Sequence, residues 1–252
     1  MQNRFVGDIG DFPKYGLLRA LSAGTDLRLG VIWYLTADGA EAQGNHVDYL
    51  ERDSAGLGAC DPDLYASLRT LVREGRRNVA AVAQSGILPA GSVFFEDVLA
   101  NDTKSTTAAR LAQRAEWVRR ASFETRACDL LLIDPDIGLE STRVARTARM
   151  GPRYAYYDEL LPLVYRGQSL VIYHHLDRSG PAEYQAKARM EQIQNRLGTV
   201  LVVALQFLRV SSRFFFVVAA ERHETLLSER ITRLRSGPWA PHFRLYQPFD
   251  LS

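Results

Sequence analysis

The chain has 252 residues, a formal net charge of +2 and an apolar fraction of 46%. This length and composition suit one globular α/β domain, or one domain with an insertion, and so small a net charge indicates no electrostatic preference for a partner. No apolar stretch approaches about 18 residues, so the sequence predicts neither a membrane span nor a signal peptide. Cys60 and Cys128 lie far apart, which indicates reduced thiols and a cytoplasmic protein.

The first half of the chain predicts three helices and at least one strand. A short helix begins near Pro13, a residue that suits a first helical turn, and residues 27–36 form a β-branched and aromatic strand. Residues 37–76 are expected to form an insertion at the rim of the domain, including a helix capped by Asp61. A long amphipathic helix covers 106–126, with Leu111, Ala115 and Val118 on its apolar face.

Strands alternate with helices in the second half. The sequence predicts strands at 128–135 and 168–177, and it predicts helices from Asp158 to about Tyr165 and at 180–198, the latter closed by Gly198. Two strands separated by a short turn then indicate an antiparallel pair, followed by a helix and an irregular tail. These last segments cover 199–208, 212–221, 222–237 and 238–252.

This alternation predicts the fold class. Buried strands separated by helices are typical of a Rossmann-like, mostly parallel sheet with helices on both faces, here with an antiparallel pair at its C-terminal edge. We expect a single domain over residues 1–252. Ligands bind outside the carboxyl ends of such strands, and three of the strands end in polar clusters at 36–39, 134–136 and 173–175. We therefore expect these clusters to lie along one edge of the sheet.

The segment Asp134-Pro135-Asp136 is the strongest candidate for chemistry. The proline restricts the backbone and so orients its neighbours. The two carboxylates could bind Mg²⁺ or Mn²⁺ through hard oxygen ligands, or accept hydrogen bonds from an amine or a ribose. Alternatively, Asp136 only caps the turn through its own backbone.

The N-terminal segment "FVGDIGDFPKY" is unusually rich in glycine, charge and aromatic residues. Lys14 could contact a phosphate or a carboxylate, and Phe5 or Tyr15 could stack on a base. The alternative is a solvated arm in which Asp11 caps the first helix. Loops of this composition often carry binding residues.

His174 and His175 end a predicted strand. Neighbouring strand residues point to opposite faces, so at most one of them faces a given site. Either could serve as a metal ligand or proton carrier, whereas the alternative is one core and one rim histidine. His46 is a weaker candidate for the same roles, and Arg213 could reach a phosphate or merely cover the turn before its strand.

In their order, these motifs resemble the class I, S-adenosylmethionine-dependent methyltransferases, and most closely the J-type family of large-subunit ribosomal-RNA adenine-N6 methyltransferases. Members open with Phe-x-Gly-x-x-x-Asp-x-x-Lys-His/Tyr and carry Asp/Asn-Pro-Pro-Tyr/Phe after the fourth strand. In this chain "IDPDIG" stands at the latter place, with Asp136 and Ile137 in the third and fourth positions. "VIWYLTADGA" matches the first strand and its acidic loop, "LVIYHHL" the fifth strand and "SRFFFVV" the seventh. The opening motif is matched by Phe5, Gly7, Asp11, Lys14 and Tyr15.

The resemblance implies a methyltransferase that acts on RNA, DNA or a nucleotide amine. In it, Asp134 would hold the substrate amine. The remaining roles implied are catalytic for Pro135, Asp136 and Lys14, cofactor-binding for Thr36, Asp38, Gly39 and Asp11, and substrate-binding for Phe5, Tyr15, His174 and His175.

Two other functions remain open from the sequence. In a metal-dependent hydrolase or nuclease, Asp134, Asp136 and Glu140, with His174 or His175, would hold Mg²⁺ or Mn²⁺ and activate water. The extra carboxylate of Asp136 favours that alternative. The third possibility is a catalytically inactive binding module.

Overall fold

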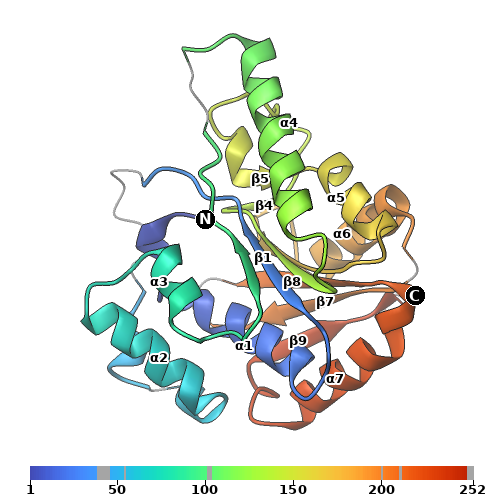
Figure 1. Cartoon of the computed structure of the whole chain (residues 1–252). Helices are drawn as coiled ribbons and strands as arrows, with labels where there is room; N and C mark the ends of the chain where they lie inside the picture. Colours follow the sequence, from blue (N-terminus) through green and yellow to red (C-terminus); the bar gives the residue numbers. More distant parts are fainter. Residues whose placement is uncertain (39–45, 54, 101–103, 200, 210–211, 249–252) are drawn as a thin grey trace.

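The computed structural model is an α/β protein whose seven-stranded sheet lies between two layers of helices (Figure 1). It describes residues 1–38, 46–53, 55–100, 104–199, 201–209 and 212–248. The strands lie in the order β2-β1-β3-β6-β8-β7-β9. They are β1 (Leu29–Trp33), β2 (Val93–Phe95), β3 (Leu130–Asp134), β6 (Ser169–His175), β7 (Leu201–Phe207), β8 (Arg213–Ala219) and β9 (Phe243–Tyr246).

The sheet is mostly parallel, with an antiparallel C-terminal edge. Strands β2, β1, β3 and β6 pair in parallel, whereas β8 pairs antiparallel with both β6 and β7, and β9 pairs antiparallel with β7. Five of the seven strands therefore point the same way, and the predicted Rossmann-like fold is confirmed. The prediction of an irregular tail is wrong where β9 forms, because Phe243 and Tyr246 are buried there in a strand too short to show periodicity.

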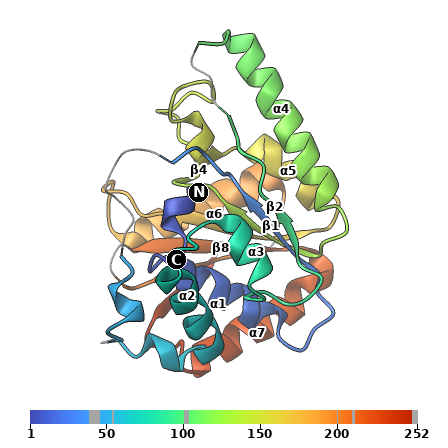
Figure 2. The ribbon, with the colours of Figure 1, turned by 60° about the vertical axis from the view of Figure 1, so that its left-hand side comes forward.

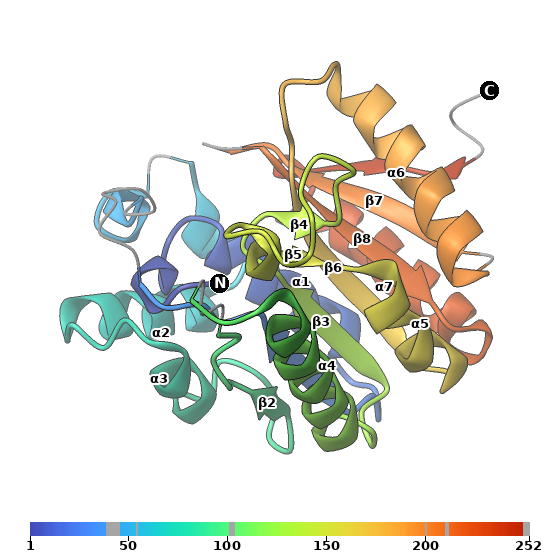
Figure 3. The same cartoon turned by 90° about the horizontal axis from the view of Figure 1, so that it is seen from above.

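Helices cover both faces of this sheet (Figures 2 and 3). Alternate strand residues supply the two cores, so that Leu132 belongs to one and Leu131 to the other. One core is completed by α1 (Asp11–Ser22), α2 (Pro62–Arg73), α3 (Val79–Gln84) and α7 (Glu224–Ser236), and the other by α4 (Thr107–Glu124), α5 (Tyr157–Tyr165) and α6 (Ala182–Leu197). None of the helices in the described ranges has the length and apolarity needed to cross a membrane.

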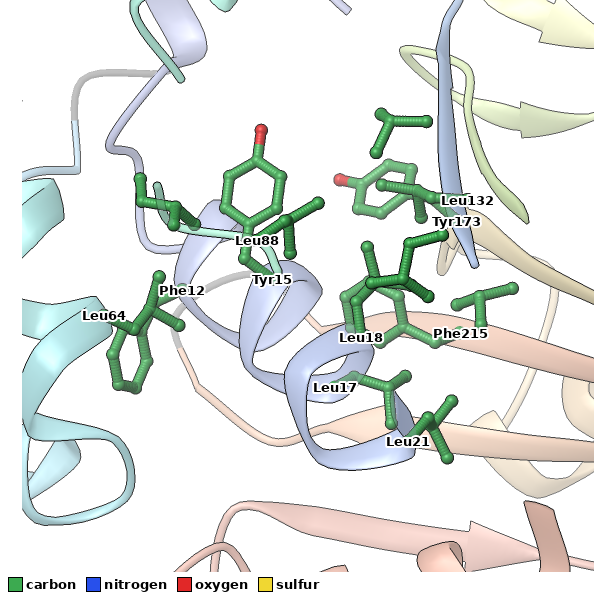
Figure 4. Packing of buried hydrophobic residues seen from close by; sticks show 14 of the residues in the cluster. Phe12, Tyr15, Leu17, Leu18, Leu21, Leu64, Leu88, Leu132, Tyr173 and Phe215 are labelled. Carbon is green, nitrogen blue, oxygen red and sulfur yellow. The ribbon is translucent and has the colours of Figure 1, made fainter. Parts of the chain in front are cut away.

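Helix α1 is the most deeply buried helix of its layer. Leu17, Leu18 and Leu21 are fully buried, and Phe12 lies near Leu64 of α2 (Figure 4). Gly16 permits this depth, because a Cβ there would stand 2.3 Å from the Trp239 ring. The chain thereby presents the amino end of α1 at the edge of the sheet where the parallel strands end.

Two predicted helix ends form as expected, whereas the predicted buried face of one helix does not. The Asp61 carboxylate accepts a hydrogen bond from the Leu64 amide at 3.1 Å, as expected of an N-cap, and Gly198 ends α6 with a φ of 64°. The predicted apolar face of α4 is wrong for Leu111 and Ala115, which are exposed, whereas Val118 packs against the core. The residues that the helix buries are Arg114, Trp117 and Ala121. A buried arginine interrupts the apolar pattern on which that prediction depended.

Shorter elements complete the described chain. Residues 39–45, which include Gly39, lie outside the described residues. The remainder of 37–76 contains α2, which packs against α1, together with two 3-10 helices. A separate two-stranded ribbon consists of β4 (Gly138–Leu139) and β5 (Tyr154–Ala155). The 3-10 helices are η1 (Asn3–Phe5), η2 (Asp48–Leu50), η3 (Leu57–Ala59), η4 (Gly151–Arg153) and η5 (Glu221–His223).

Candidate functional site

A cavity of about 510 Å³ opens at the carboxyl edge of the parallel strands. The N-terminal segment, the ends of β3 and β6, the start of β8 and the β4–β5 ribbon enclose it. In Figures 1 and 3 the N-terminus lies beside this ribbon. The volume is within the range of small-molecule sites, about 300–1,000 Å³.

The topology of the sheet explains why the cavity forms there. From β1 the chain connects to β2 on one side and then crosses to β3 on the other, so strand order reverses between β1 and β3. Loops diverge at such a switch point and leave a crevice outside the carboxyl ends of the strands. Asp134, the last residue of β3, pairs with Trp33 of β1 at this point and lines the cavity.

A buried ionic cluster forms one wall of the cavity. The Lys14 Nζ lies 2.7 Å from Asp11 Oδ1 and 2.8 Å from Asp134 Oδ2. The three side chains are between 2% and 4% exposed. Burial alone would lower the pKa of Lys14, but the charges of Asp11 and Asp134 outweigh it and raise that pKa well above its ordinary value. Lys14 is therefore a fixed cation, and it holds the Asp134 carboxylate in one position.

Helix geometry brings this cluster together. Asp11 begins α1 and Lys14 follows one turn later, so both side chains lie on the same face of the helix. The Gly7 amide donates a hydrogen bond to Asp11 Oδ2 at 3.0 Å, which ties the N-terminal segment to the cluster. Burial raises the pKa of Asp11, although the neighbouring Lys14 charge opposes that rise.

The residues after Asp134 turn directly into the β4–β5 ribbon. Asp136 Oδ2 lies 2.5 Å from Arg153 Nε, and the Ile137 amide donates a hydrogen bond to the Arg153 carbonyl at 2.9 Å. Gly138 has a φ of 144°, and a Cβ on it would lie 2.1 Å from His174 Nδ1. The chain can therefore cross the end of β6 at this point only with glycine.

His174 and His175 lie on opposite faces, as predicted for neighbouring strand residues, yet both line the cavity. His174 Nδ1 accepts a hydrogen bond from the Leu139 amide at 3.0 Å. Burial, with the charge of Arg189, lowers the pKa of His174 to about 3. Burial and the Arg213 charge lower the pKa of His175 to about 4. Both imidazoles are therefore neutral near pH 7, and the cavity extends over both faces of the sheet edge.

Tyr173 and Arg213 complete the wall on the α1 side. The Tyr173 hydroxyl lies 2.8 Å from His175 Nε2, and burial raises the pKa of Tyr173 to about 12. Arg213 begins β8, pairs with His175 in the sheet and is 4% exposed. Its guanidinium packs against Gly10, where a Cβ would stand 1.6 Å from Nη1.

The structure does not bring every predicted site residue to the cavity. Phe5 lines it, whereas Tyr15 is fully buried in the core with its ring 5.7 Å from Lys14 Nζ. Thr36 and Asp38 are not among the residues that line the cavity. The Thr36 amide donates to the Met1 carbonyl at 2.9 Å, and Asp38 is exposed and accepts from the Arg4 amide at 3.3 Å.

Several lining residues have no clear signal in the sequence. Arg153 ends η4, Tyr154 begins β5 and Arg189 lies on α6, all far along the chain from Lys14. Asp8 could have been suspected from its glycine-rich surroundings, and its carboxylate accepts hydrogen bonds from the Gly10 and His46 amides, both at 3.0 Å. Because these residues meet through tertiary packing, their sequence spacing carries no information.

Metal binding finds little support in this arrangement. Within the described ranges, no group of three or more His, Cys, Asp or Glu side chains is placed to hold a metal ion. The two carboxylates proposed as ligands already have cationic partners, since Asp134 contacts Lys14 and Asp136 contacts Arg153. A metal ion on these carboxylates would stand beside the positive charges of Lys14 and Arg153, which would oppose its binding.

Comparisons with known proteins do not identify a family for this chain. No protein-family model matches the sequence, and no curated protein matches it significantly. The fold class and the cavity are therefore the features from which a function must be inferred. The resemblance of the motifs to J-type methyltransferases stays an interpretation of short sequence patterns.

Proposed function

We propose that this cavity is the active site of an S-adenosylmethionine-dependent methyltransferase that acts on an amine of a nucleotide or nucleic acid. The observation that supports this most is the position of Asp134-Pro135, at the end of β3 beside the switch point and against Lys14. The reversed strand β8 between β6 and β7 also matches the antiparallel edge of class I methyltransferases. Fold and motif therefore point to the same chemistry.

The charges that line the cavity nearly balance. Five aspartates stand against one lysine and three arginines, the Met1 amino group also lines the cavity, and both histidines are neutral near pH 7. A site for a polyphosphate would need an excess of cationic groups. A balanced lining is better suited to a ligand that, like S-adenosylmethionine, carries both a carboxylate and an ammonium group.

The residues present fit S-adenosylmethionine. Asp8, Asp136 and Asp177 are the lining carboxylates outside the Lys14 cluster, and they could accept hydrogen bonds from its ribose hydroxyls or ammonium group. The Arg213 guanidinium could contact its carboxylate. When bound, this cofactor supplies an electrophilic methyl group. The predicted contact through Gly39 lies outside the described residues.

Asp134 would orient the methyl acceptor. Its Oδ2 is held by Lys14, and Lys14 is itself held by Asp11, so the carboxylate is a fixed acceptor for an amine N–H. An amine held there would be aligned for attack on the methyl group that the cofactor would supply, and alignment supplies much of the rate in such a transfer. The transfer would form a nitrogen–carbon bond as the sulfur–carbon bond breaks, and the amine proton would pass to solvent.

Ligand binding provides the first test. Melting temperature and calorimetric titration would be measured with S-adenosylmethionine, its demethylated product, Mg²⁺ and Mn²⁺. A ligand at about 100 times its Kd stabilises the native state by about 2.7 kcal/mol, which corresponds to a rise of roughly 5–10 °C for a chain of this length. We expect that rise with the two methyl-cofactor species.

Two matched variants test whether Asp134 is needed for methyl transfer. D134N should abolish methyl transfer to nucleosides or RNA. D129N, the same substitution at the residue before the other end of β3, should preserve it. Circular dichroism would establish that both variants fold. No response to either cofactor species would refute the methyltransferase, and a response only to Mg²⁺ or Mn²⁺ would favour the hydrolase. Full activity in D134N would remove the role given to Asp134.

A further inference from the structure

Arg189 of α6 places a cation beside the β4–β5 ribbon. Its Nη1 donates hydrogen bonds to the Glu140 carbonyl at 3.1 Å and to Gln192 Oε1 at 2.9 Å. Glu140 directly follows β4, and its amide donates a hydrogen bond to the Ala155 carbonyl of β5 at 2.8 Å. The guanidinium is therefore attached to the ribbon through Nη1, and the half-buried side chain lines the cavity.

These contacts use only part of the Arg189 guanidinium. It also carries hydrogen-bond donors on Nε and Nη2, and within the described part of the chain no carbonyl, amide or carboxylate oxygen contacts either nitrogen. No carboxylate of the described residues lies within ion-pair distance of Arg189, whereas the Nε of Arg153 contacts Asp136. Nε and Nη2 form an edge that can bind a carboxylate or a phosphate through two parallel hydrogen bonds.

Two hydroxyl groups near Arg189 are further donors. Ser141 follows Glu140 and lines the cavity, and its Oγ accepts a hydrogen bond from the Arg143 amide at 3.3 Å but donates none to the residues described. Tyr157 is 3% exposed, and its hydroxyl has no hydrogen-bond partner among the same residues. Burial raises the pKa of Tyr157 and the Arg189 charge opposes that rise, so the two groups are close. Because buried polar groups are rarely unpaired, these donors indicate a site for an acceptor with several oxygens.

Arg189 and the Lys14 cluster belong to opposite faces of the sheet edge. Asp134 contacts Lys14 of α1 on one face. On the other face, the His174 ring lies 5.8 Å from the ring of Phe216, which belongs to the core that α6 completes. Arg189 is near His174, because its charge adds to the effect of burial in lowering the pKa of that imidazole. An anion bound at Arg189 would therefore lie away from the carboxylates of the Lys14 cluster, which would otherwise repel it.

We propose that Arg189 forms an oxyanion subsite of the cavity, in which Nε and Nη2 bind one carboxylate or phosphate group of a ligand and Ser141 donates a further hydrogen bond. This subsite goes beyond the methyltransferase function and does not depend on it. A single anionic group is expected, because the nearly balanced charges of the cavity offer no excess of cations for a polyphosphate.

Nuclear magnetic resonance of the histidine side chains tests whether an anion reaches Arg189. Inorganic phosphate and acetate would be titrated at constant ionic strength into the wild type, R189Q and R189K, with the His174 signals as the reporter. R196Q is the matched control, because Arg196 also lies on α6 and contacts Glu140, at 3.5 Å, but does not line the cavity. Circular dichroism would establish that the variants fold.

We expect at least one of the two anions to shift the His174 signals of the wild type and R196Q, with the same affinity within about twofold, and to bind R189Q about tenfold or more weakly, given the strength of hydrogen bonds between charged groups. R189K should lie between them, because an ammonium keeps the charge but lacks the paired donors. No shift up to millimolar concentration, or unchanged affinity in R189Q, would overturn the proposal. If R189Q does not fold, unchanged affinity in R189K would overturn it.

Larger ligands identify the source of the anionic group. Calorimetry would compare adenosine 5′-monophosphate with adenosine, and S-adenosylmethionine with its decarboxylated analogue, in the wild type and R189Q. A preference for the monophosphate that R189Q removes would assign the subsite to a phosphate, and such a preference for S-adenosylmethionine would assign it to the cofactor carboxylate. Neither preference would mean an adventitious ion only and would overturn the proposal.

The subsite and the methyltransferase fail in different ways. Anion binding that depends on Arg189, without any response to S-adenosylmethionine or its demethylated product, would refute the methyltransferase and leave the subsite standing. A response to these cofactor species that R189Q leaves unchanged, without binding of phosphate or acetate, would do the reverse.

Discussion

The two ends of the central sheet carry similar side chains but differ in their access to ligand. At the carboxyl end, Lys14, Asp134 and His175 line a cavity. At the amino end, Ser169 Oγ lies 2.9 Å from His223 Nδ1, and His223 Nε2 lies 3.9 Å from Asp129. By residue type alone, the amino end resembles a hydrolytic triad.

Burial and hydrogen bonding separate the two ends. Ser169 is fully buried, and its hydroxyl also accepts a hydrogen bond from the Ala220 amide at 2.9 Å. This serine joins β6 to the end of β8 and has no path to a substrate. Contact between suitable residue types is therefore not enough to make a functional site. The cavity at the switch point gives the carboxyl end the access to a ligand that the amino end lacks.

We expect the largest effect from K14M, a substitution at the carboxyl end of the sheet. Removing Lys14 leaves Asp11 and Asp134 buried without a cation, and loss of one partner of a buried ion pair costs about 3–5 kcal/mol. Urea denaturation would measure the free energy of unfolding, and S-adenosylmethionine binding should be lost as well. R73A is the control, since Arg73 pairs with Glu51 at the surface and should change little. A K14M protein with wild-type stability would contradict the role given to the cluster.

G138A should have the next largest effect. An alanine would have to adopt a φ of 144° and meet the His174 ring, so we expect a cost of about 3 kcal/mol, of which about 1–3 kcal/mol is backbone strain. The control is G86A, because Gly86 also has a positive φ but has no atom within 4 Å of its Cβ position. The melting temperatures of G138A and G86A would measure the two losses of stability. Equal losses in both variants would show that contact with His174 is unimportant.

Acidification should destabilise the protein through the cavity histidines. The folded pKa values of about 3 for His174 and about 4 for His175 lie below the value of about 6.5 expected in the unfolded chain. As pH falls below about 6.5 the unfolded state takes up protons first, so stability declines until the folded pKa is reached, by about 1.4 kcal/mol per pH unit for each histidine.

The measurement is denaturation at pH 6.5 and 5. For His175 the expected loss over this interval is about 2 kcal/mol, and H175Q should lack that share of the pH dependence. The same slope in wild type and H175Q would contradict a neutral, buried imidazole at this position.

The smallest effect is expected at the amino end. S169A leaves the Ala220 amide and His223 without their shared partner, at a cost of about 1 kcal/mol. Ligand affinity should be unchanged, because Ser169 lies at the opposite end of β6 from the cavity. Calorimetry with S-adenosylmethionine would measure this affinity. Loss of binding in a folded S169A protein would contradict the claim that only the carboxyl end binds ligand.

Much of the fold could be predicted because its signals are local. Alternating strands and helices, the N-cap at Asp61 and the C-cap at Gly198 each depend on residues within a few positions of one another. The same signals failed for α4, whose buried face includes Arg114. Its guanidinium is satisfied by Glu159, 45 residues away, and no local pattern reports such a partner.

The sequence by itself determined the class of the fold and the edge at which polar residues collect, because side-chain periodicity and strand ends are properties of short segments. Only the tertiary structure decided which of those residues meet. It brought Lys14 to Asp134 across 120 positions, placed Tyr15 in the core, and left Thr36 and Asp38 away from the cavity. The physical reason is that strand order and helix packing are set by long-range burial, so residues distant in the chain become neighbours at the switch point.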